Sequence, residues 1–271
     1  MDHTFNTPGH VLADVRIPSG DVIVRARDMD VSTVHIEGDR GDEDITVTCE
    51  PAPGGGHHLL VEVRNKKNWA LFRFSWGQDL EVVLEVPTST DLQVNTGSAD
   101  LGIRGTVAGI DVRTASGEVR FENVDGDVKV KSASGDTQGR SVQGHLTCHG
   151  ASGDVDVETV RGGVTIRTAS GDLELGEVDG GLSVSTVSGD VTIGALRQGN
   201  AQVRSVSGDI EVGVAQGVGV FLDVQSASGE VACNLDAAAE LAGGSADLEI
   251  NASSVSGDIT IRRAAVRAGS A

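Results

Sequence analysis

Aromatic side chains are scarce in this sequence, which has five Phe, two Trp and no Tyr among 271 residues. A globular enzyme of this length normally carries more aromatic bulk in its core. Glycine is abundant instead, with 37 residues, and the apolar remainder is mostly Val, Ile, Leu and Ala. This composition favours a thin aliphatic core with many turns.

Basic side chains are also few, because 21 Lys and Arg face 40 Asp and Glu and give a net charge of −19. Nucleic acids and anionic membranes require clustered Lys and Arg, so neither is expected as a partner. The general effect of such a charge is solubility. Mimicry of DNA by an acidic surface is the alternative.

Long apolar runs are absent, and none approaches the roughly 18 residues of a membrane-spanning helix. We therefore expect no transmembrane segment. The N-terminal stretch MDHTFNTPGHV has neither a basic region nor an apolar run, so it does not resemble a signal peptide. These features predict a cytoplasmic protein.

Cysteine is limited to Cys49, Cys148 and Cys233, an odd number without the spacing of a metal site. Each lies in an alternating apolar and polar stretch, which predicts reduced, buried thiols. The seven histidines follow no catalytic or zinc-binding pattern, and the glycines form no phosphate loop or dinucleotide fingerprint. The sequence thus predicts no catalytic, cofactor-binding or metal-binding residue, and no enzyme activity.

The dominant feature of the sequence is a nine-residue unit, seen in ASGDVDVET, VRGGVTIRT and ASGDLELGE. Its fifth and seventh positions are apolar around one polar residue, as in a short half-buried strand. Serine-led turns recur every 18 residues from Ser98 to Ser188, and the spacing then lengthens toward Ser256. Fixed periodicity of this kind indicates a solenoid. We predict an all-β fold, a parallel β-solenoid of the β-helix or β-roll type, with about 18 residues per coil in two nine-residue halves.

The predicted organisation is a single β-solenoid domain over residues 1–271. Residues 1–96 would form irregular N-terminal coils and a cap, residues 97–263 the regular repeats and residues 264–271 a polar tail.

An acid usually follows the turn glycine, so stacked coils would align these side chains in one column. At the spacing of neighbouring strands, about 4.8 Å, two exposed like charges repel by roughly 0.9 kcal/mol in water, which is tolerable if each carboxylate accepts a turn N–H. Calcium-binding nonapeptide repeats have a different unit, GGxGxDxUx, and calcium needs six to eight oxygens, so calcium is not expected. The predicted acidic ladder consists of Glu118, Asp136, Asp154, Asp172, Asp190, Asp209, Glu230 and Asp258.

Most of the bulky side chains gather in one short basic-flanked segment. They would either cap the open end of the solenoid or form an exposed patch for a partner or a lipid surface. The candidate interaction patch consists of Trp69, Leu71, Phe72, Phe74 and Trp76.

Three stretches, PSGDVIVRA, LEVVLEVP and SVSGDITIRRA, resemble a bacterial family of β-strand-repeat proteins labelled "putative adhesin". The family is a domain of unknown function common in actinobacteria, and the resemblance covers almost the entire chain. It implies a repeat-built β fold, and its label implies a surface location. It implies no catalytic residues.

Our leading hypothesis is a non-catalytic β-solenoid that acts as a scaffold for a protein partner or for self-association. A self-assembling filament protein of the bactofilin type is the second hypothesis, and exposed strand edges at uncapped ends would favour it. A carbohydrate-active β-helix enzyme is the third. A groove with clustered acids and aromatic platforms would favour that enzyme.

Overall fold

The computed structural model describes residues 1–38, 43–65, 80–235 and 247–265. These residues form 25 strands and no helix. The strands belong to two mostly parallel sheets. The predicted all-β class is therefore confirmed.

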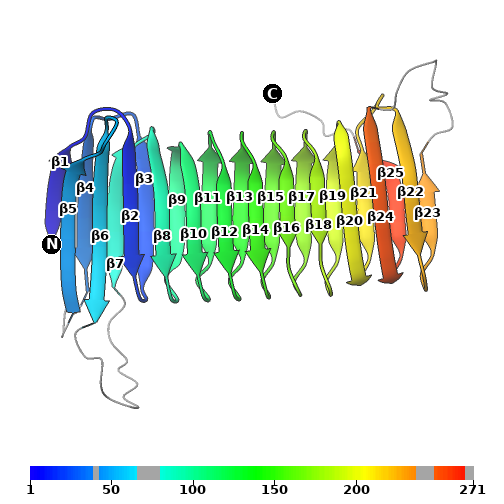
Figure 1. Cartoon of the computed structure of the whole chain (residues 1–271), viewed down its shortest axis with the longest axis horizontal. Coiled ribbons are helices and arrows are strands. Elements are labelled where there is room, and N and C mark those ends of the chain that lie inside the picture. The colour runs from blue at the N-terminus through cyan, green and yellow to red at the C-terminus, as the bar shows by residue number, and fades with distance from the viewer. Residues whose placement is uncertain (39–42, 66–79, 236–246, 266–271) are drawn as a thin grey trace, which may run out of the picture. The chain divides into compact units, whose positions relative to one another are not determined.

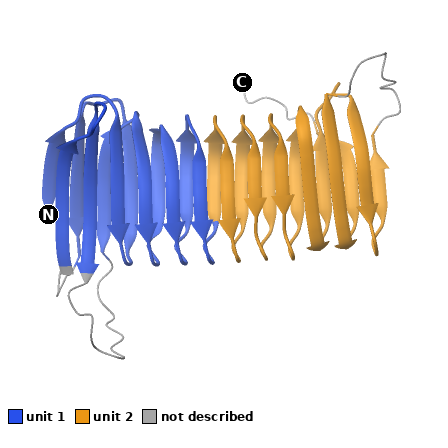
Figure 2. Cartoon of the chain, in the orientation of Figure 1, with its two compact units in different colours: residues 1–136 blue, residues 137–271 orange. Residues whose placement is uncertain are grey.

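The chain divides into two compact units, residues 1–136 and 137–271 (Figure 2). This division does not test the predicted single domain or its internal boundaries, which stay predictions.

In the first unit, one sheet has the strand order β1-β4-β7-β3-β9-β11 and the other β5-β6-β2-β8-β10-β12 (Figure 1). The strands are β1 Asp2–Asn6, β2 Val11–Ile17, β3 Asp21–Arg27, β4 Val31–Glu37, β5 Glu43–Pro51, β6 His57–Asn65, β7 Glu81–Pro87, β8 Thr90–Thr96, β9 Asp100–Val107, β10 Gly109–Thr114, β11 Val119–Val124 and β12 Val128–Ser132.

In the second unit, the corresponding orders are β13-β15-β17-β19-β21-β25-β23 and β14-β16-β18-β20-β24-β22. The strands are β13 Thr137–Val142, β14 Leu146–Gly150, β15 Val155–Val160, β16 Val164–Arg167, β17 Leu173–Val178, β18 Leu182–Ser185, β19 Val191–Leu196, β20 Gly199–Ser207, β21 Ile210–Val214, β22 Val220–Ser226, β23 Val231–Asn234, β24 Leu248–Ser256 and β25 Ile259–Arg263.

Strands of the regular repeats pair in parallel, each residue with the residue 18 positions along the chain. Val155 lies opposite Leu173, and Leu173 lies opposite Val191. In the other sheet Val164 lies opposite Leu182. This register confirms the parallel solenoid with about 18 residues per coil.

The interior of most rungs, a rung meaning one strand from each sheet, is filled by aliphatic side chains, whereas β13 has Thr137 and Gly139 at inward positions. In β15, Val155, Val157 and Val160 are buried and the residues between them are exposed or half-buried. Stacking similar rungs places aliphatic residues over aliphatic residues, so each added rung extends the core.

The turn glycines allow the rungs to stack closely. Gly189 has φ 128°, and a Cβ built on it would lie 2.2 Å from the carbonyl oxygen of Gly171 in the rung below. A side chain at this position would strain the backbone and also collide with it. The turn glycine is thus a requirement of the stack.

At the N-terminal end of the chain the parallel pattern stops. β1 pairs antiparallel with β4, and β5 pairs antiparallel with β6. β7 lies between β4 and β3, antiparallel to the first and parallel to the second. The order of strands in space therefore differs from their order in the chain.

The C-terminal strands are also out of chain order. β24 pairs with β20 on one side and with β22 on the other, while β25 lies between β21 and β23. The last rung in the sequence has thus inserted between two earlier ones. Consequently β22 and β23 form the outermost rung of the second unit among the described residues.

This strand order explains the different environments of the cysteines. All three are free: Cys148 is buried, Cys49 is half-buried and Cys233 is exposed. Burial raises the pKa of the Cys148 thiol to about 12. The prediction of a buried thiol is wrong for Cys233, because its strand belongs to the outermost rung.

Candidate functional site

The acidic ladder of the second unit is bonded to the backbone. Asp154 Oδ1 accepts a hydrogen bond from the N–H of Asp172 at 2.8 Å, and Asp172 Oδ1 accepts one from the N–H of Asp190 at 2.9 Å. Asp190 Oδ1 in turn accepts from the N–H of Asp209 at 2.8 Å. Each carboxylate therefore joins its own turn to the turn of the next rung.

The inserted rung changes the order of the ladder. The N–H of Asp258 donates to Asp209 Oδ1, and the N–H of Glu230 donates to Asp258 Oδ1, both at 2.8 Å. Asp258 therefore precedes Glu230 in space, although it follows Glu230 in the chain.

The first unit contains the remaining two acids of the predicted ladder. The N–H of Glu118 donates to Asp100 Oδ1 at 2.9 Å, which repeats the same turn contact. The backbone carbonyl of Asp136 accepts from the N–H of Val119 at 2.8 Å.

These contacts give the ladder a structural role. An exposed hydrogen bond of this kind contributes about 1 kcal/mol, which offsets the roughly 0.9 kcal/mol of unscreened repulsion between neighbouring exposed carboxylates. Within the described parts of the chain, no three His, Cys, Asp or Glu side chains are grouped to hold a metal ion. The ladder thus serves to link the turns of successive rungs.

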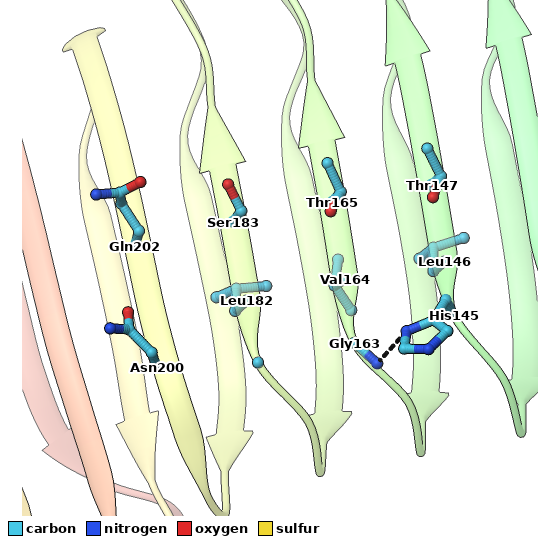
Figure 3. Close-up of a pocket in the computed structure, with 11 residues that line it drawn as sticks. His145, Leu146, Thr147, Gly163, Val164, Thr165, Leu182, Ser183, Asn200 and Gln202 are labelled. Carbon is cyan, nitrogen blue, oxygen red and sulfur yellow. Dashed lines mark hydrogen bonds between the residues drawn. The ribbon is translucent and has the colours of Figure 1, made fainter.

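A shallow groove lies on the outer face of the second sheet, across β14, β16, β18 and β20 (Figure 3). Its volume is about 410 Å³. His145 lies at the β14 end and Asn200 at the β20 end, with Gly163 and Gly181 between them.

The groove is hollow because two successive rungs have glycine at an outward-facing position. A Cβ on Gly163 would lie 3.1 Å from His145 Nδ1, which is tight. A Cβ on Gly181 would meet only the carbonyl oxygen of Asn200, at 3.4 Å, and the φ of Gly181 lies outside the left-handed region. Neither the turn geometry nor the packing requires glycine at Gly181, unlike at Gly189.

Polar, uncharged groups line the groove. Thr147 lies opposite Thr165, and Thr165 lies opposite Ser183, so their hydroxyls form a row across three rungs. Asn200 and Gln202 add two amides. Each of these side chains can both donate and accept hydrogen bonds.

The imidazole at the β14 end is oriented by the backbone. His145 Nδ1 accepts a hydrogen bond from the N–H of Gly163 at 3.0 Å. In the neutral ring this contact assigns the proton to Nε2.

The family assignment comes from a family model described as Toastrack DUF4097, which matches residues 13–262. The chain belongs to this family. The family resemblance that the repeat motifs indicated is therefore confirmed. The all-β, repeat-built fold that this resemblance implied is the fold that the structure has.

Three solved structures resemble the Toastrack chain along nearly its full length. A "putative adhesin" from Bacteroides fragilis is 13% identical, with a TM-score of 0.48, and the match covers 96% of both chains. A "putative lipid binding protein" from Parabacteroides distasonis is 15% identical, with a TM-score of 0.42 and 96% of both chains covered. A "putative cell adhesion protein" from Clostridium sporogenes is 10% identical, with a TM-score of 0.25, and covers 97% of this chain and 99% of its own.

The search of curated proteins found no match. Over the described ranges, the Toastrack chain has no helix with the length and hydropathy needed to cross a membrane.

The outermost rung of the second unit is a further candidate surface. Val220, Leu222 and Val224 of β22 occupy the inward column, yet all three are only half-buried. Val231 of β23 is 44% exposed, and Phe221, on the outer face, is 58% exposed. Equivalent inward positions of inner rungs, such as those of β24, are buried.

The candidate interaction patch of Trp69, Leu71, Phe72, Phe74 and Trp76 lies outside the described residues. Whether this segment caps the repeats or contacts a partner stays open.

The groove was not predicted from the sequence. The sequence feature that could have predicted the groove is the Gly-Gly pair in VRGGVTIRT and VDGGLSVST. Most other nine-residue units have an acid instead of the second glycine. The first glycine of each pair belongs to the turn. The second one, Gly163 or Gly181, removes a side chain from the outer face.

Proposed function

We propose that this Toastrack protein is a non-catalytic scaffold that binds a macromolecular partner on the outer face of the second sheet of its second unit. The observation that carries this proposal is the groove over β14, β16, β18 and β20. It combines an open floor with a row of hydroxyl and amide groups, the kind of polar groups that orient ligands in binding sites.

The lining chemistry favours binding over catalysis. A glycoside hydrolase needs two carboxyl groups on either side of the scissile bond. The described side chains that line the groove are hydroxyl, amide, imidazole and aliphatic groups. The ladder carboxylates Asp154, Asp172 and Asp190 do not line the groove, because they lie in the turns that precede the strands of the other sheet, where they accept hydrogen bonds from backbone N–H groups of neighbouring turns.

Site-specific photocrosslinking in the native host tests this function. A photoreactive amino acid replaces Thr165 on the groove face, and in a matched variant it replaces Thr192 on the outer face of the other sheet. Both positions are half-buried strand threonines in the second unit. We expect a specific adduct from position 165 and none from position 192. Absence of an adduct from both would contradict the scaffold, and an adduct from position 192 alone would reject the groove as its contact face.

Self-association through the outermost rung is a second candidate function. Half-buried aliphatic side chains and the free edges of β22 and β23, which no other described strand pairs with, favour contact with a second copy of the chain. The outer strands of the first unit are β1 and β5, and β5 is less suited to pairing because it ends in Pro51, which has no N–H to donate to a partner strand. This difference favours a closed, two-fold dimer over a filament.

Sedimentation velocity over a range of concentrations tests the dimer. We expect a reversible monomer–dimer equilibrium that Leu222→Lys shifts to monomer, while Thr4→Lys on β1 leaves it unchanged. A wild-type monomer at every concentration would reject this candidate, and thermal melts of both variants check that they are folded.

A further inference from the structure

We infer that the groove binds an uncharged polysaccharide, extended across the strands with one sugar ring over each rung. This inference rests on the proposed function, because it names the class of ligand for the same surface. Three features support it: the spacing of the groups, their hydrogen-bonding chemistry and the charge around them.

The spacing of the rungs suits a glycan. Neighbouring strands lie about 4.8 Å apart, so the hydroxyls of Thr147, Thr165 and Ser183 repeat at about that interval. One pyranose residue in an extended chain has a similar length, and successive rings would therefore meet equivalent groups. An extended peptide advances about 3.3 Å per residue and would lose this register within a few residues.

The groups themselves match sugar hydroxyls. Thr, Ser, Asn and Gln side chains donate and accept, as sugar hydroxyls do, and their short reach leaves the floor accessible. The floor at Gly181 is bare backbone and exposed. Because Gly181 has no side chain, a flat ring can approach the backbone here more closely than at a rung with a larger residue.

The column of outward positions that contains Gly163, Gly181 and Asn200 continues beyond the groove. Asn200 lies opposite Glu249, and Glu249 lies opposite Phe221 of the outermost rung. The aromatic ring of Phe221 is 58% exposed. Its apolar face offers a stacking surface for the C–H face of a further sugar ring.

The charge around the groove favours a neutral ligand. Arg167 and Arg204 lie along one side, two positions further along β16 and β20 than the hydroxyl and amide row, and Glu249 and Asp223 lie beyond the β20 end. These opposite charges leave no strong local field of one sign. A polyanion would in addition meet the net charge of −19.

The structure supplies a matched pair of variants for the test. Gly181→Leu would fill the groove at a position where a Cβ has room. Gly102→Leu is the control, because Gly102 also has a normal φ, has nothing within 4 Å of its Cβ position, and lies on β9 of the other sheet. Thermal melts should show that both variants remain folded.

Isothermal titration calorimetry is performed with neutral hexasaccharides of β-1,4-glucan, β-1,3-glucan and α-1,4-glucan, with the matching disaccharides, and with polygalacturonate. We expect at least one neutral hexasaccharide to bind more tightly than its disaccharide and than polygalacturonate. Gly181→Leu should lower this affinity at least tenfold, and Gly102→Leu should leave it unchanged.

The inference is overturned if no neutral hexasaccharide binds, if polygalacturonate binds more tightly, or if Gly181→Leu binds like the wild type. Its failure can be distinguished from failure of the scaffold. A protein adduct at position 165 without glycan binding would keep the scaffold and reject the glycan, whereas the absence of any adduct and of glycan binding would reject both.

Discussion

Two glycines of the second unit differ in what the fold demands of them. Gly189 combines φ 128° with a carbonyl oxygen 2.2 Å from its would-be Cβ, while Gly181 has room for a side chain. We expect Gly189→Ala to lower the free energy of unfolding by about 2–3 kcal/mol, because it adds backbone strain and a collision. Gly181→Ala should change it by less than about 0.5 kcal/mol. Urea denaturation of both variants measures the difference, and equal losses would show that the groove glycine is structural.

Single carboxylates of the ladder can be tested in the same way. Asp190 accepts the N–H of Asp209 in the next rung. We expect Asp190→Ala to lower the free energy of unfolding by about 1 kcal/mol, since it removes an exposed hydrogen-bond acceptor. Asp190→Asn keeps a carbonyl acceptor and relieves like-charge repulsion, so it should be nearly neutral. Similar losses in both variants would indicate that the negative charge itself, rather than the acceptor, is required.

At the scale of elements, strand β1 is attached to β4 by a histidine–carboxylate bridge. His35 of β4 bonds Asp2 of β1 and Glu37, the second contact at 2.7 Å. Bonds to Asp2 and Glu37 raise the pKa of His35, and the bond to His35 lowers the pKa of Asp2. The bridge therefore stabilises the β1–β4 pair while His35 is protonated and Asp2 is ionised.

The two pKa shifts determine the pH range in which the bridge stabilises the pairing of β1 with β4 most strongly. The contribution of His35 is complete below its ordinary pKa and is lost as the pH rises through its raised value. The contribution of Asp2 is complete above its ordinary pKa and is lost as the pH falls through its lowered value. We expect hydrogen exchange at β1, corrected for the intrinsic rate, to be slowest between about pH 4 and pH 6.5. His35→Gln should flatten this profile, and an unchanged profile would contradict the role of the bridge.

For the molecule as a whole, the net charge of −19 opposes contact between copies. If the outermost rungs associate, raising the ionic strength from about 0.01 M to about 0.5 M shortens the Debye length from about 30 Å to less than 10 Å and weakens this repulsion. We expect the dimer fraction in sedimentation experiments to increase with salt. A dimer that dissociates with salt would instead indicate ion pairs at the interface.

The repeat alone was enough to predict the parallel strands, the 18-residue register and the aliphatic interior. The reason is local: a turn such as that at Ser170-Gly171 recurs at the same interval, and a one-residue slip would expose every inward side chain. The members of the acidic column follow from the same register.

The tertiary structure alone decided the order of the rungs and the position of the groove. The backbone hydrogen bonds are similar for every rung of this kind. The local sequence pattern therefore does not predict that β24 and β25 pair with β20 and β21. That insertion leaves Cys233 exposed and places Asp258 before Glu230. Outward positions such as Gly181 follow no hydrophobic periodicity, because solvent imposes no pattern on them. Only the stacked rungs bring them together as a surface.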